Sequence, residues 1–144
     1  MDIELVKKIF LDNFSFLYEI GFTTINVYQD KSYKYKIGIS LENNVLGYKF
    51  NFAYYDKNPI DNNTETYGLF FALFSKDSHI DISRLLKGDN FFGIYSIFQY
   101  FILPHEVKYE YVLKSLSKII KDNYLEIFKG EYWIAIDYDL RDDY

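Results

Sequence analysis

Hydrophobic side chains recur at helical spacing in residues 2–18, with charged residues between them. This spacing predicts an amphipathic helix that packs one face on a core. Gly21 follows at the position where a residue in the left-handed conformation closes many helices, and Phe22 begins the next element. The residues on the predicted buried stripe are Val6, Ile9, Phe10, Phe14 and Leu17.

The next part of the chain favours β-strands. Residues 22–28 are rich in β-branched and aromatic side chains, which are common in strands. Residues 33–41 alternate hydrophobic and polar positions, and residues 46–54 repeat the alternation after a turn at residues 42–44. Residues 66–75 are hydrophobic on both sides, so we expect that strand to be central or covered. These strands together predict an antiparallel meander.

The C-terminal half is predicted to be mainly helical. Residues 77–81 are typical of a capping segment, in which Asp81 would cap a short helix over residues 82–87. Residues 91–103 fit a helix or a strand, and the helix is favoured. Residues 104–128 predict a long helix that Lys129-Gly130 closes, and residues 131–138 a last strand or extended segment. The stripe of the long helix is Val107, Val112, Leu116, Ile119, Ile120, Asn123 and Ile127.

These elements together predict the α+β class. The expected fold is an antiparallel meander sheet of about four to five strands, with an N-terminal helix and a long C-terminal helix packed on one face. A chain of 144 residues is long enough for one sizeable core and too short for two, so residues 1–144 are expected to form a single domain.

Charge and cysteine content narrow the function. The 16 Lys and Arg against 21 Asp and Glu give a net charge of -5, which disfavours nucleic acid as a partner and favours a basic protein. The absence of cysteine excludes disulfides, thiolate zinc sites and cysteine nucleophiles. No basic, apolar leader opens the chain, and the most apolar stretches, residues 68–74 and 91–103, are shorter than a membrane span. We therefore expect a soluble, cytoplasmic protein with no membrane association.

Candidate chemical groups are sparse. His79 and His105 fit no metal-ligand spacing. Asp77, His79 and Asp81 offer three potential ligands, but the same residues are typical of a capping loop, which is the interpretation we favour. No phosphate-binding glycine loop or nucleophile motif is present either. The sequence thus predicts no catalytic residue, cofactor or metal, and a protein that is not an enzyme.

Three local features of the chain are the Gly21-Phe22 helix end with the tyrosine-rich meander, the segment Asp81-Ile82-Ser83-Arg84-Leu85-Leu86, and the helix end Tyr124-Leu125-Glu126-Ile127-Phe128-Lys129-Gly130. Together they resemble a type of small bacterial protein found among the immunity proteins and uncharacterised neighbours of polymorphic toxins. The resemblance implies a protein that binds and blocks a cognate toxin, commonly a nuclease with a basic cleft, and it implies no catalytic residues.

An acidic inhibitor gains electrostatic steering toward a basic toxin, so acidic segments are the expected partner-binding surfaces. Three alternatives remain open at this stage. A small-ligand or peptide-binding domain would use residues 91–103 as the wall of an aromatic pocket, and a structural or interaction protein would need no such pocket. A hydrolase or transferase of unfamiliar type would need polar groups that converge inside a cleft. The candidate partner-binding residues are Asp56, Asp61, Glu65, Asp77, Asp81, Asp137 and Asp139.

Overall fold

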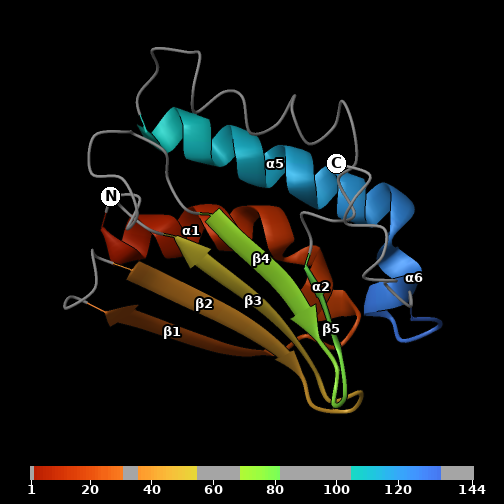
Figure 1. The fold of residues 1–144 in the computed structure, drawn as a ribbon. Coiled ribbons are helices and arrows are strands. Elements are labelled where there is room, and N and C mark those ends of the chain that lie inside the picture. Colours follow the sequence, from red (N-terminus) through yellow and green to blue (C-terminus); the bar gives the residue numbers. More distant parts are fainter. Residues whose placement is uncertain (1, 31–35, 55–68, 82–104, 134–144) are drawn as a thin grey trace, which may run out of the picture.

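The computed structural model describes residues 2–30, 36–54, 69–81 and 105–133. These ranges form a five-stranded antiparallel sheet in the order β1-β2-β3-β4-β5, with helices on one face (Figure 1). The predicted α+β class is confirmed. The strands are β1 Thr24–Asp30, β2 Lys36–Asn43, β3 Tyr48–Tyr54, β4 Leu69–Phe74 and β5 His79–Asp81. The helices are α1 Ile3–Phe14, α2 Phe16–Glu19, α5 His105–Asn123 and α6 Leu125–Phe128.

The N-terminal helix has the buried stripe that its spacing predicts, because all five hydrophobic residues of the stripe are buried. Asp2 caps it, with a side-chain oxygen that accepts a hydrogen bond from the Leu5 amide at 2.8 Å. The prediction of one helix to residue 18 is wrong in detail, since the structure divides it into α1 and α2 at Ser15. The Tyr18 amide donates to the Ser15 carbonyl at 3.0 Å, an i to i+3 bond that tightens this turn.

Two glycines close the helical parts as their positions predict. Gly21 has φ +106°, and the amides of Gly21 and Phe22 donate to the carbonyls of residues 18 and 17. Gly130, with φ +78°, follows α6 in the same arrangement. Both ends therefore satisfy helix carbonyls through a left-handed residue, where a side chain would be strained. Because the Phe22 amide serves this cap, β1 begins at Thr24 and extends to Asp30, two residues beyond the predicted strand.

The core lies between the helices and one face of the sheet. Alternate residues of β2 and β3 point into it, and the register aligns Ile39 with Phe52 and Phe52 with Phe71. Phe10 of α1 packs on this row, with its ring centroid 5.2 Å from that of Phe52. The predicted alternation of strands two and three is confirmed on this face, and β4 lies between two strands, as expected for a covered strand.

Helix α5 packs beside α1 on the same face of the sheet (Figure 1). Tyr109 joins α5 both to the sheet and to α1. Its ring centroid lies 5.8 Å from that of Phe52 in β3, and its hydroxyl donates to the Val6 carbonyl of α1 at 3.4 Å. The predicted stripe of this helix is partly wrong, because Val107 and Asn123 are exposed. With Tyr109 on the core side, the helical period carries Val107 outward.

The long helix also ends earlier than predicted. Tyr124 leaves the helical conformation, with φ −128° and ψ 14°, so α5 stops at Asn123 and α6 is a separate turn. This change of direction carries Phe128 into the core, where its ring centroid lies 6.0 Å from Phe22 and 5.5 Å from Phe50. The last predicted strand, residues 131–138, is described only over 131–133, which are not in a strand.

The β2–β3 turn lies two residues later than predicted. Glu42 and Asn43 are the last residues of β2, and the loop is residues 44–47. The Asn43 side chain is 3% exposed and bonds in two directions: Nδ2 donates to the Ile20 carbonyl at 3.1 Å, and Oδ1 accepts from the amides of Val45 and Leu46, each at 3.1 Å. Asn43 thus links the end of α2 to this hairpin.

The predicted capping segment at residues 77–81 is partly wrong, because residues 79–81 form β5, while the predicted cap from Asp81 onto a helix at 82–87 involves residues outside the described ranges. A turn between Ser75 and Ser78 folds this strand back onto β4, with the Ser75 amide donating to the Ser78 carbonyl at 2.8 Å. Ile80 is the physical reason, since pairing with Leu73 places its side chain in the core, with 0% exposed. The loop at 56–65, the helix at 82–87 and the segment 91–103 lie outside the described residues.

No helix in the described ranges combines the length and the apolar character needed to cross a bilayer.

Replacing Asn43 by Ala removes all three of its hydrogen bonds to the backbone of Ile20, Val45 and Leu46. We expect a loss of about 2–3 kcal/mol in the free energy of unfolding, measured by urea denaturation. The neighbouring Asn44 is the matched control, because it is exposed and its side chain makes one bond, to Thr24 Oγ1 at 3.0 Å. Equal losses in the two variants would contradict the linking role of Asn43.

Candidate functional site

Two of the seven predicted partner-binding residues lie in described ranges. Asp77 is exposed in the turn between β4 and β5, and Asp81 is half-buried at the end of β5, opposite Ala72. They come from the same hairpin but from its two ends. The other five lie outside the described ranges: Asp56, Asp61, Glu65, Asp137 and Asp139. The acidic interface therefore stays a prediction.

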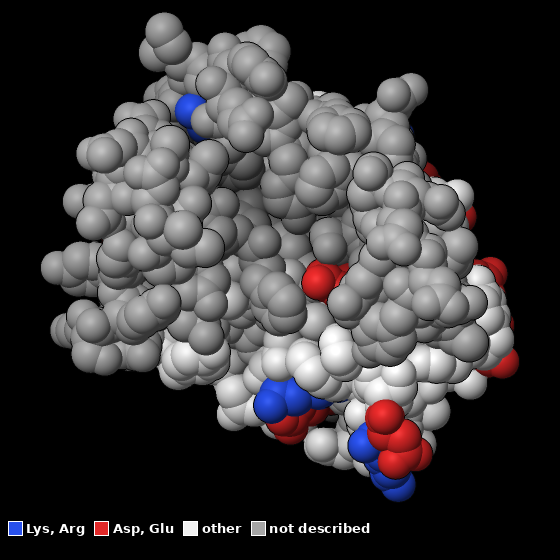
Figure 2. Space-filling view, viewed as in Figure 1, with Lys and Arg blue, Asp and Glu red and all other residues white. Residues whose placement is uncertain are grey.

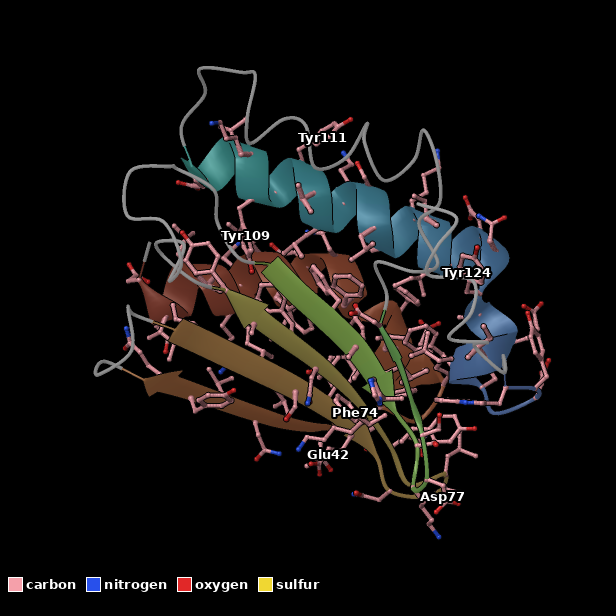
Figure 3. The ribbon with its side chains drawn as sticks, viewed as in Figure 1. Glu42, Phe74, Asp77, Tyr109, Tyr111 and Tyr124 are labelled. Carbon is pink, nitrogen blue, oxygen red and sulfur yellow. The ribbon has the colours of Figure 1, made fainter. Side chains whose placement is uncertain are left out.

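The described surface near Asp77 carries both signs of charge. Glu42 Oε1 lies 3.9 Å from Lys49 Nζ, and Asp77 follows the exposed Lys76 in the chain. Figure 2 shows acidic and basic side chains next to one another at the lower end of the molecule, the region where Figure 3 labels Glu42 and Asp77. This end of the sheet offers a partner a mixed pattern of charge.

The three potential ligands Asp77, His79 and Asp81 do not form a group that could hold a metal ion. Residues 79 and 81 share one face of β5, while Ile80 between them enters the core. The His79 ring stacks on Phe74, with centroids 5.4 Å apart and planes at 24°. Among the residues described, no group of three His, Cys, Asp or Glu side chains could hold a metal ion.

Among the described titratable groups, Tyr109 has the pKa that its surroundings shift most. Burial raises the pKa of the Tyr109 hydroxyl far above its usual value, and the nearby Tyr54 adds a smaller rise. The two rings meet edge to face, with centroids 5.3 Å apart. Its hydroxyl is neutral and donates to a backbone carbonyl, so Tyr109 stabilises the contact between α5 and α1 instead of presenting a reactive group to a ligand.

The outward side of α5 carries a continuous row of exposed residues, which we call the α5 outer stripe. At 3.6 residues per turn these positions fall on one side of the helix, opposite Tyr109, Leu116 and Ile120. Figure 3 shows Tyr111 on the side of α5 away from the sheet and Tyr109 on the side toward it. This row was not predicted from the sequence, because the helical spacing placed Val107 on the buried stripe. The α5 outer stripe is Val107, Tyr111, Lys114, Lys118 and Lys121.

The basic end of this stripe borders a hollow between α5 and the junction of α1 with α2, which we call the helical hollow. Its volume is about 380 Å³. Lys121 Nζ lies 5.7 Å from the centroid of the Phe16 ring, a cation–π distance that holds one ammonium at the wall. The residues that line it are Asn13, Phe16, Lys114, Ser117, Lys118, Lys121 and Asp122.

Comparison with known protein families, with curated proteins and with solved structures found no match to this chain.

Replacing Tyr109 by Phe tests its buried hydroxyl. A folded-state pKa above the unfolded value means that the unfolded chain releases this proton first, so stability falls as pH rises above about 10. Between pH 9 and pH 11 the wild type should lose about 1.4 kcal/mol more in total than Tyr109→Phe, measured by urea denaturation, because the unfolded tyrosine titrates in the middle of this range. Tyr111→Phe, at a half-exposed position, is the control and should follow the wild type.

Proposed function

We propose that this chain is a non-catalytic binding protein of the immunity type, which blocks a cognate toxin, and that the α5 outer stripe is its interface. One observation carries the proposal: Val107 and Tyr111 are 47% and 45% exposed on the outward side of a helix whose inward side is fully packed. Both hydrophobic side chains therefore lie outside the buried core.

Single exposed hydrophobic residues are common on protein surfaces, but these two are neighbours. Positions i and i+4 on a helix have Cβ atoms about 5–6 Å apart, so Val107 and Tyr111 present one apolar surface. Lys114 and Lys118 continue the stripe, and both are exposed. An aromatic anchor bordered by charged residues is the usual composition of a protein–protein interface.

The stripe also indicates the chemistry of the partner. Three lysines beside an apolar pair suit a surface on which acidic groups border a hydrophobic pocket. This differs from the basic partner expected from the net charge. Net charge acts through long-range steering, whereas the charge at the contact itself sets which partner is complementary.

The test uses the proteins encoded next to this chain's gene, one of which the proposal requires to be the toxin. Co-expression should restore growth of cells that produce the toxin, and the purified pair should bind. Tyr111→Ala should weaken binding by about 10- to 100-fold, measured by biolayer interferometry, because truncating a central aromatic anchor costs about 2 kcal/mol. Tyr132→Ala is the matched control, since Tyr132 is 48% exposed on another part of the surface.

A further variant separates the stripe from the acidic surface. If Asp77→Lys abolishes binding while Tyr111→Ala leaves it unchanged, the toxin binds at the β4–β5 turn and the α5 outer stripe is not the interface. If no neighbouring gene product is neutralised, the immunity assignment itself is wrong.

A further inference from the structure

The helical hollow concentrates positive charge on a chain whose net charge is -5. Lys114, Lys118 and Lys121 stand at i, i+4 and i+7 on α5, a spacing at which like charges repel. The ion pairs of the described residues, Lys8 with Asp12 and Lys49 with Glu42, include none of the three. Asp122 is the one acidic residue in the lining. The lining therefore carries three lysines and one carboxylate, while the exposed Glu110, one turn before Lys114, lies outside the lining.

The neutral polar side chains of the lining already donate hydrogen bonds to backbone carbonyls of the protein. Ser117 Oγ donates to the Lys114 carbonyl at 3.0 Å, and Asn13 Nδ2 donates to the Ile9 carbonyl at 2.8 Å. Ser117 is 8% exposed, so its position is set by packing. Ser117 retains only acceptor capacity for a ligand, whereas Asn13 retains the acceptor Oδ1 and a second N–H on Nδ2. The ammonium groups supply the charged donors.

We propose that the helical hollow binds a phosphate group, held by the ammonium groups of Lys114, Lys118 and Lys121. A phosphate monoester carries a charge of about −1.5 to −2 and three acceptor oxygens, which matches three ammonium donors better than the single charge and two oxygens of a carboxylate. Lysine serves as a point charge in many phosphate sites.

The hollow also has space and an apolar wall for an organic group attached to the phosphate. Its volume of about 380 Å³ lies within the range of roughly 300–1,000 Å³ for small-ligand pockets. Phe16 supplies the apolar wall. Free phosphate and a phosphate ester share the same recognition chemistry at the lysines, and contact with Phe16 would distinguish them.

The inference does not depend on the toxin-binding proposal. Phosphate binding is measured on the chain alone, so the failure of one proposal leaves the other intact.

The experiment is a titration of the isotope-labelled full chain with inorganic phosphate and with phenyl phosphate, followed by amide NMR shifts at constant ionic strength in KCl. Both ligands should give saturable shifts at Asn13, Ser117 and Lys118. Tighter binding of phenyl phosphate assigns an ester that contacts Phe16, and equal affinity assigns the phosphate group alone. Either result supports the phosphate site.

Charge-matched variants make the test specific. Lys118→Met should weaken binding at least tenfold, and Lys114→Gln provides a second variant at the same site. Lys76→Met removes one positive charge at the exposed β4–β5 turn, and it should leave the affinity unchanged. The dispersed amide spectrum of each variant reports whether it is folded.

Three results would overturn the proposal. Shifts that do not saturate, or that KCl alone reproduces, would show a general salt effect. Equal weakening by Lys76→Met and Lys118→Met would show attraction by overall charge. Succinate that binds as tightly as phosphate would show that the hollow does not select a phosphate group.

Discussion

The contact of aromatic rings across the inner face of the sheet is the interaction on which the rest of the structure depends. The ring centroid of Phe10 lies 5.0 Å from that of Phe14 and 5.2 Å from that of Phe52, and the centroids of Phe52 and Phe71 are 4.8 Å apart. Large rigid rings leave few ways to place a helix over a sheet, so this row sets the position of α1. Tyr109 joins the same row from α5 and completes one core made by both helices and the sheet.

The candidate sites follow from the way α5 meets that core. Once Tyr109 faces α1 and the sheet, the helical period places Val107 and Tyr111 in solvent, and the lysines after them on the same side. The helical hollow forms where this basic side passes Phe16 at the junction of α1 and α2. The exposed apolar pair and the basic hollow are therefore two consequences of one helix orientation.

This arrangement separates local charge from total charge. The chain is acidic overall, yet its described hollow gathers three lysines, and the described end of the sheet mixes Glu42 and Asp77 with lysines. Composition alone points to a basic partner, because it counts charges without their positions. Binding depends on which charges lie together, and the folding of distant segments decides that.

Local patterns in the sequence determined the fold class, the N-terminal helix, the alternation of β2 and β3, and the glycine ends at Gly21 and Gly130, because each depends on residues within a turn or a strand. The pairing of His79–Asp81 with β4, the break at Tyr124 and the outward position of Val107 were decided only by tertiary structure. The β4–β5 pairing is a local hairpin that is selected because Ile80 enters the common core, and the other two features depend on packing against segments far apart in the chain. Periodicity shows that a helix has a buried side, but the surface it packs against selects which residues that side contains.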